Sequence, residues 1–343
     1  MAGETIFVTG GTGHLGYQVI LKALEAGYTV RAAVRSQSKA NKILSAPSIK
    51  ALNPGNRLQF ATVEDMLTDG AYNEAIKGAI YAIHVASPIT YAYKEGDDYD
   101  EVFKIPALKG TMNLLEAAQQ SSTIKRVVIT SSIVAIIPWS DFISGTSSTI
   151  YNENSRTPTP SAHYANVFEA YSASKVAALN ETEKWVDEKK PAFDVAHIYP
   201  AFIIGADELA STVEEALAGT NAQVTGPASG KDMGPAPGAS IHVEDVARAH
   251  VKALDPALPP NQGYVLASMG LEGTRWEDVF EIVRREFPDK VGSGGLRNDG
   301  AIATLAVKID ERSSEERLGW GFKGYEEQVK SAVGGYLALA RRG

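Results

Sequence analysis

The feature that most constrains the fold is an apolar run that passes directly into small residues, in TIFVTGGTGHLG at residues 5–16. Gly10, Gly13 and Gly16 have the spacing G-x-x-G-x-x-G. A strand that turns through glycines into a helix lets an anionic group approach the backbone, because the helix N-terminus presents N–H donors and partial positive charge. A glycine-rich turn without a ligand is the alternative. The strand before the glycines and the helix after them favour a dinucleotide-binding turn.

Short apolar runs rich in β-branched residues recur along the first 200 residues, and helical patterns separate several of them. We expect helices at residues 15–26, ended by Gly27, at 111–120 and at about 171–189. Apolar strands that alternate with helices predict βαβ units and a doubly wound parallel sheet covered on both faces. The expected strands are residues 5–8, 29–34, 58–63, 80–85, 127–130 and 195–199.

The pattern becomes less regular after Pro200. Residues 217–240 are rich in Gly, Ala, Pro and Ser and are predicted to form a long loop region, whereas residues 241–254 predict a strand followed by a helix. We therefore expect an α/β protein of Rossmann type with a smaller, mostly helical C-terminal domain that binds substrate. The predicted dinucleotide domain is residues 1–200, with 241–265 returning to it, and the predicted substrate domain is residues 201–240 and 266–343.

Composition narrows the classes of partner. The chain has 343 residues, 44% of them hydrophobic, and its net charge of -8 without a basic run argues against nucleic acid or an anionic membrane surface. It contains no cysteine, and His84, His242 and His250 lack ligand spacing, so we expect no metal site. Neither a signal-peptide pattern nor an apolar run near the ~20 residues of a membrane span is present, so we expect a cytoplasmic protein.

The end of the second expected strand distinguishes between the two nicotinamide dinucleotides. An acidic residue at this point would bind the ribose 2′-hydroxyl of NAD, but YTVRAAVRSQSKA contains no Asp or Glu. Arg35 directly follows the strand and Lys39 lies one helical turn further. A guanidinium binds a 2′-phosphate through two hydrogen bonds. Solvated surface charges are the alternative, but the missing acid and the basic residues together predict NADPH.

Tyr171 and Lys175 lie four residues apart in YSASK, at the beginning of an expected helix, so their side chains share a face. The preceding expected strand ends in Ser131 and Ser132, and a doubly wound sheet binds its ligands at the carboxyl ends of its strands. Hydride reduction of a carbonyl needs a proton donor. A tyrosine, with an ordinary pKa of about 10, acts near neutrality when a cation such as Lys175 lowers that pKa. A serine hydroxyl would donate to the carbonyl oxygen as negative charge develops.

The chain resembles the extended short-chain dehydrogenase/reductases, and within them the dihydroflavonol-reductase-like branch that includes fungal and yeast aldehyde and ketone reductases. The resemblance spans nearly the whole chain and rests on VTGGTGHLG, GYTVRAAVRS, VEDML, HVASPI, ITSS, YSASK, YPAFIIG and HVEDVARAHV. It implies Ser132 as the catalytic serine, with Ser131 as the alternative, beside Tyr171 and Lys175. It also implies that the following residues contact the cofactor: Gly10, Thr12, Gly13, His14, Leu15, Gly16, Asp65, Met66, Val85, Ala86, Ser87, Pro200 and Ile203.

The leading hypothesis is the NADPH-dependent reduction of a mainly apolar aldehyde or prochiral ketone by a monomer or homodimer. Four aromatic residues near these motifs are open to two interpretations, a substrate wall or ordinary core: Trp139, Tyr164, Phe168 and Phe202. A nucleotide-sugar epimerase or dehydratase of the same fold is the second hypothesis, and Arg35 and Lys39 argue against it because such enzymes usually retain NAD. A dinucleotide sensor without turnover is the third. The serine, tyrosine and lysine set argues against it.

Overall fold

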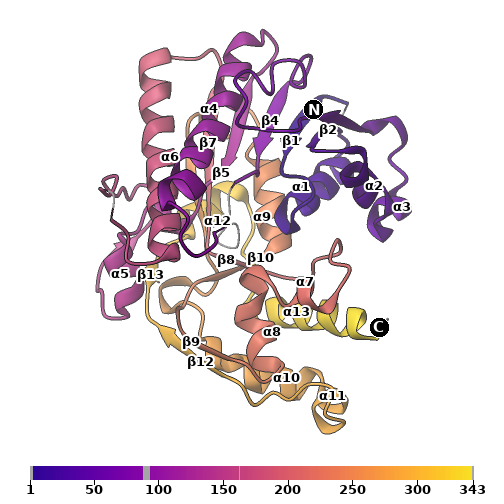
Figure 1. Cartoon of the computed structure of the whole chain (residues 1–343), viewed down its shortest axis with the longest axis vertical. Coiled ribbons are helices and arrows are strands. Elements are labelled where there is room, and N and C mark those ends of the chain that lie inside the picture. The colour runs from indigo at the N-terminus through magenta and orange to yellow at the C-terminus, as the bar shows by residue number, and fades with distance from the viewer. Residues whose placement is uncertain (1–2, 88–92, 162, 342–343) are drawn as a thin grey trace. The chain divides into compact units, whose positions relative to one another are not determined.

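The computed structural model describes residues 3–87, 93–161 and 163–341. A seven-stranded sheet organises the first part of the chain (Figure 1). Its strands are β1 Thr5–Thr9, β2 Thr29–Val34, β3 Leu58–Thr62, β4 Tyr81–His84, β5 Arg126–Thr130, β7 Asp194–Pro200 and β11 Gly263–Leu266. Their order is β11-β7-β5-β4-β1-β2-β3, and the pairs from β7 to β3 are parallel. The predicted doubly wound sheet is therefore confirmed, and each expected strand is present.

Helices pack on the sheet because its central strands β1, β4, β5 and β7 are buried on both faces. They are α1 His14–Glu25, α2 Gln37–Ser45, α3 Pro47–Leu52, α4 Ile105–Gln120, α6 Val167–Lys189 and α9 Val243–Lys252. One hydrophobic cluster joins Phe7 and Val127 of the sheet to Leu114 of α4 and Trp185 of α6. Helices α4 and α6 therefore cover the same face of the sheet (Figure 1).

Two helices begin earlier than expected, and a side-chain cap explains one of the two starts. Helix α6 begins at Val167 because the Asn166 Oδ1 accepts from the backbone N–H groups of Phe168 and Glu169, each at 3.0 Å. Helix α4 begins at Ile105, after a π-helical turn at Asp100–Lys104 that extends it toward the N-terminus. Tyr171 consequently lies one turn inside α6 instead of at its start.

The remaining elements form a second, smaller set. Helices α5 Trp139–Ser144, α7 Val213–Ala216, α8 Ala222–Ala228, α10 Val279–Glu286, α11 Pro288–Gly292, α12 Arg312–Leu318 and α13 Tyr325–Ala340 accompany six short strands. These strands pair in parallel as β8 Phe202–Ile204 with β10 Ser240–His242, β9 Asp232–Pro237 with β12 Ala301–Leu305, and β6 Ile150–Tyr151 with β13 Lys308–Ile309. The fully buried Trp276 lies in the hydrophobic core of these elements, and its Nε1–H donates to the Pro237 carbonyl at 2.9 Å.

The prediction of a long loop over residues 217–240 is wrong. This segment contains α8 and β9. Its glycine and proline content predicted a loop, although Pro227 lies near the end of α8. Strand β9 could not be predicted locally because its backbone pairs with β12, a strand some 70 residues further along the chain. Tertiary contacts, with Val224 and Ala236 buried in the same core, stabilise elements that local sequence preference does not.

The chain divides into two compact units, which are described separately. The first comprises Met1–Trp139, Asn154–Tyr199 and Ala247–Tyr264, and the second comprises Ser140–Glu153, Pro200–Val246 and Val265–Gly343. The chain passes from one unit to the other after Tyr199 and after Tyr264. Two stretches expected in the first domain belong to the second unit: Ser140–Glu153, because β6 pairs with β13, and residues 241–246, because β10 pairs with β8.

Candidate active site

The glycine loop between β1 and α1 is shaped by close backbone packing. Gly10 has a φ of +74°, and a Cβ at this position would lie 2.6 Å from the Ala86 nitrogen. A Cβ on Gly16 would lie 2.1 Å from the Gly10 carbonyl oxygen. Any side chain at either position would therefore clash with backbone atoms, so the fold itself requires both glycines.

Gly13 differs from these two glycines, because a Cβ there would meet only the Gly10 oxygen at 3.6 Å, an ordinary contact. Gly13 is exposed at the N-cap of α1, beside Thr12 and His14, and the first turn of α1 carries no acidic residue. The chain's own packing leaves this position open. An uncompensated helix N-terminus with open space before it fits a pyrophosphate that approaches the backbone. Leu15 is buried and anchors the start of the helix.

The carboxyl end of β2 exposes the two predicted basic residues. Arg35 and Lys39 lie in and just after the turn from β2 into α2, and both are exposed. Neither side chain forms a hydrogen bond or an ion pair with another residue that the structure describes. Asp65 and Met66 follow β3, where the Asp65 carboxylate accepts from the Leu67 N–H at 2.8 Å. Contact of these side chains with the ribose and adenine of a dinucleotide stays a prediction.

Residues Val85–Ser87 follow β4 directly and are half-buried. The Ala86 N–H donates to the Thr9 hydroxyl at 3.2 Å, which ties this segment to the end of β1. The segment therefore joins the glycine loop to the catalytic candidates, since Gly10 packs against Ala86 on one side and Ser87 contacts Lys175 on the other.

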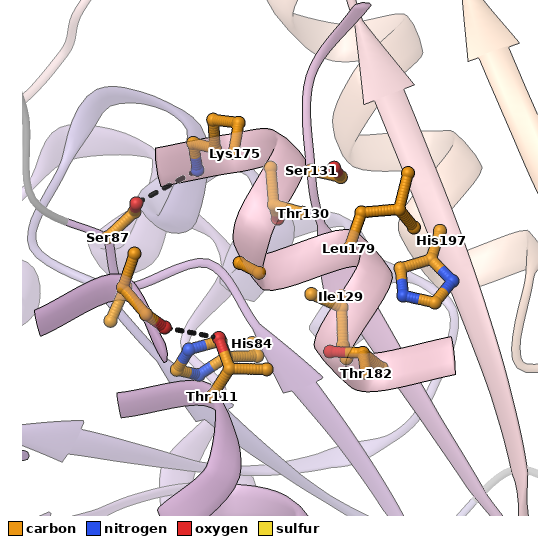
Figure 2. A pocket seen from close by; sticks show the side chains of 13 residues that line it. His84, Ser87, Thr111, Ile129, Thr130, Ser131, Lys175, Leu179, Thr182 and His197 are labelled. Atoms are coloured by element: carbon orange, nitrogen blue, oxygen red, sulfur yellow. Dashed lines mark hydrogen bonds between the residues drawn. The ribbon is translucent and has the colours of Figure 1, made fainter. Parts of the chain in front are cut away.

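Lys175 lies on α6 and is only 6% exposed. Its ammonium Nζ donates to the Ser87 Oγ at 2.9 Å, as Figure 2 shows. The same Nζ lies 5.6 Å from the centre of the half-buried Tyr171 ring. Burial lowers the pKa of Lys175 to about 8, because removal from water disfavours its charged form. The contact with Ser87 was not predicted, and only the position of a serine just after a strand hinted at it.

The two candidate serines occupy different surroundings. Ser131 is buried and lines the pocket that contains Lys175 (Figure 2), and its backbone N–H donates to the Ile198 carbonyl at 2.7 Å. Ser132 is half-buried and caps the 3₁₀ turn Ile133–Ala135, where its Oγ accepts from the Val134 N–H at 3.4 Å. The choice of Ser132 over Ser131 stays a prediction.

Three predicted substrate residues belong to the first unit. The Tyr164 hydroxyl donates to the Asp100 Oδ1 at 2.9 Å, and burial raises the pKa of this tyrosine. Phe168, in the first turn of α6, is 57% exposed, which is unusual for a large apolar side chain. Trp139 is half-buried at the start of α5. Phe168 is therefore the most exposed of the three, and its role in binding substrate stays a prediction.

The other predicted residues, Pro200, Phe202 and Ile203, belong to the second unit and lie at or just after the end of β7. Pro200 is buried at the end of that strand, and Ile203 of β8 pairs with Ile241 of β10. Phe202 stacks on Phe142, with ring centres 6.4 Å apart. Phe202 is thus at least partly a core residue, so a role in binding substrate stays a prediction.

Two negative findings apply to the residues that the structure describes. Among them, no three His, Cys, Asp or Glu side chains are arranged to hold a metal ion. No helix within those residues combines the length and the apolar character needed to cross a membrane.

Comparison with known proteins places this site in a family. Residues 6–267 match the NAD dependent epimerase/dehydratase family. The ketoreductase CTB6 of Cercospora beticola is 38% identical over 350 residues, covering 100% of this chain and 97% of that protein. Aldehyde reductase 2 of Sporidiobolus salmonicolor is 30% identical over 351 residues, covering 98% and 97%. The yeast methylglyoxal/isovaleraldehyde reductase Gre2 complexed with NADPH has a similar fold, with a TM-score of 0.79 and 21% identity over 98% of this chain and 99% of that one. The chain therefore belongs to the NAD dependent epimerase/dehydratase family, the extended short-chain dehydrogenase/reductases.

Proposed function

We propose that the protein reduces a mainly apolar aldehyde or prochiral ketone to an alcohol, with NADPH as the reductant. The observation that carries this proposal is the buried Lys175 ammonium, fixed by Ser87 and 5.6 Å from the Tyr171 ring, in the same unit as an open glycine loop. Its relatives named ketoreductase CTB6 and aldehyde reductase 2 support the reaction class.

Bound NADPH would supply the hydride. The chain's own residues perform the proton chemistry. Tyr171 delivers its phenolic proton to the carbonyl oxygen as negative charge develops there. The charge of Lys175 favours the phenolate that remains and so assists the transfer near neutral pH. Ser132, or Ser131 in its place, donates a hydrogen bond to the same oxygen and stabilises the developing alkoxide.

The preference for NADPH rests on Arg35 and Lys39. Both are exposed just after β2, and their side chains have no hydrogen-bond or ion-pair partner among the described residues, so a guanidinium and an ammonium are available for a 2′-phosphate. The Gre2 structures solved as NADPH complexes support the same choice. We further propose that Asp65 and Met66 border the adenine.

An apolar substrate is favoured over a nucleotide-sugar by the charges near the site. Arg156 is the only Lys or Arg within residues 139–168. Its guanidinium is already engaged by the Glu183 carboxylate, at 2.9 Å through Nε and 2.7 Å through Nη2. A diphosphate would find no uncommitted cation in this stretch. The exposed Phe168 supports an apolar ligand instead.

The proposal is tested by turnover of the purified chain. NADPH oxidation is measured against aryl ketones, aldehydes and keto esters, with Phe168→Ala and Phe202→Ala as substrate-wall variants. We expect reduction of at least one class, with KM and enantiomeric excess changed in the Phe168→Ala variant. A protein that carries tightly bound NAD, interconverts a UDP- or GDP-sugar and ignores every carbonyl would be an epimerase or dehydratase instead.

A further inference from the structure

One buried side chain of helix α4 holds the loop that follows strand β3. Asn113 lies in α4 and is 5% exposed. Its amide nitrogen Nδ2 donates to the Met66 carbonyl at 2.8 Å and to the Thr68 carbonyl at 3.0 Å. A backbone carbonyl oxygen only accepts, and an asparagine amide has two hydrogens to donate. Both hydrogens are therefore used to bind the backbone of this loop.

The side chain of Met66 packs on the same part of α4. A Cβ on Gly110 would lie 3.3 Å from the Met66 Cε and 3.4 Å from its Sδ, so the thioether lies directly against the helix. Gly110 and Asn113 are three positions apart and share a face of α4. The Lys109 Nζ adds an ion pair with the Asp69 Oδ1 at 3.1 Å, which contributes little because it is exposed. One face of α4 thus fixes both the backbone and the side chain of Met66.

This loop begins beside the basic residues at the end of β2. Strands β2 and β3 are parallel with Val34 opposite Thr62, and the Val63 N–H donates to the Val34 carbonyl at 2.9 Å. Arg35 and residues 64–68 therefore leave the sheet from the carboxyl ends of neighbouring strands. A doubly wound sheet binds its ligands at these ends.

We propose that Asn113 is a positioning residue for the adenine end of the bound dinucleotide and acts through Met66. This rests on the proposed function, in which Asp65 and Met66 border the adenine. A loop that is already ordered loses less conformational entropy when its ligand binds. The two hydrogen bonds from Asn113 should therefore increase the affinity for any ligand that carries the adenine.

Asn113→Asp and Asn113→Leu test the proposal by calorimetric titration of the full chain. The ligands are NADPH, NADH and 2′,5′-ADP, which has the adenine and the 2′-phosphate but no nicotinamide. Aspartate keeps the shape of asparagine but directs a carboxylate oxygen at two carbonyl oxygens. Leucine removes the donors without adding a charge, and so keeps the test open if Asn113→Asp does not fold. In the folded variants the Kd for all three ligands should rise by a similar factor, about five- to thirtyfold.

Asn180→Asp and Asn180→Leu are the matched controls. The Asn180 Nδ2, on α6, also donates twice to a loop, to the Thr157 carbonyl at 3.0 Å and to the Thr159 Oγ1 at 2.9 Å. We expect these controls to lower the melting temperature and to leave the three Kd values unchanged. A merely structural role of Asn113 predicts the same result for its own variants, so the Kd values separate the two roles.

Unchanged Kd values in folded Asn113 variants would overturn the inference and leave the proposed function intact. A rise for NADPH and NADH without a rise for 2′,5′-ADP would also overturn it, because the disturbance would then lie at the nicotinamide end. A wild-type chain that binds none of the three ligands would overturn the proposed cofactor, and the role of Asn113 with it. A parallel rise for all three ligands, absent from the Asn180 controls, supports the inference.

Discussion

Replacing Ser87 by alanine should shift the pH range in which the enzyme works. The Ser87 Oγ accepts a hydrogen bond from the Lys175 ammonium at 2.9 Å, and burial has already lowered the pKa of Lys175 to about 8. A hydrogen bond to a charged group contributes about 1.5–3 kcal/mol, and one pKa unit corresponds to about 1.4 kcal/mol. Because the lost bond stabilises the charged form, Ser87→Ala should lower the pKa of Lys175 by a further one to two units, roughly.

The pH profile of kcat/KM reports the pKa values of the free enzyme. The proposed mechanism needs a charged Lys175 beside Tyr171, so activity should fall as the pH rises through the pKa of Lys175, about 8. In Ser87→Ala this alkaline limb should move toward lower pH by about one to two units. Thr111→Val is the control, because Thr111 lines the pocket that contains Lys175 but its hydroxyl donates to the Ala107 carbonyl of its own helix. An alkaline limb that stays in place in Ser87→Ala would refute the claim that Ser87 stabilises the lysine charge.

Three further predictions concern the cofactor, the serines and stability. Arg35→Ala should raise KM for NADPH about ten- to a hundredfold and leave KM for NADH nearly unchanged, whereas equal losses with both would indicate a structural role. Ser132→Ala should lower kcat by ~10²–10³, because it removes the hydroxyl assigned to the carbonyl oxygen. A loss of activity in Ser131→Ala but not in Ser132→Ala would reverse this assignment. Lys175→Met should raise the melting temperature below pH 8, since the folded pKa of Lys175, about 8, lies below its ordinary 10.5. That gain should vanish by about pH 10.5, where the unfolded lysine is also neutral.

The sequence predicted the sheet well because most of its strands are short apolar runs separated by turn residues. The glycine loop was predicted equally well, because close backbone contacts require glycine at positions 10 and 16. Helix α8 and strand β9 could not be predicted, because their prolines and glycines oppose regular structure and only packing against distant residues stabilises them.

The candidate site was predicted in part for the same reason. Tyr171 and Lys175 are close in sequence and share a helix face, so their proximity follows from helical spacing. The contact between Lys175 and Ser87 joins residues that lie 88 positions apart in the sequence. The pairing of Ile129 in β5 with His84 in β4 and with His197 in β7 depends on the register of three strands. No local pattern encodes either arrangement. The contact between Lys175 and Ser87 could therefore be seen only in the folded chain.

The central claim is that Tyr171 delivers the proton in an NADPH-dependent carbonyl reduction, and Tyr171→Phe tests it most directly. Phenylalanine preserves the ring that faces the Lys175 ammonium but has no proton to give. Single-turnover reduction of the best carbonyl substrate is measured beside the Kd for NADPH in both proteins. The account predicts that the variant binds NADPH with nearly wild-type affinity and loses almost all reduction. Near-wild-type reduction by Tyr171→Phe would contradict it.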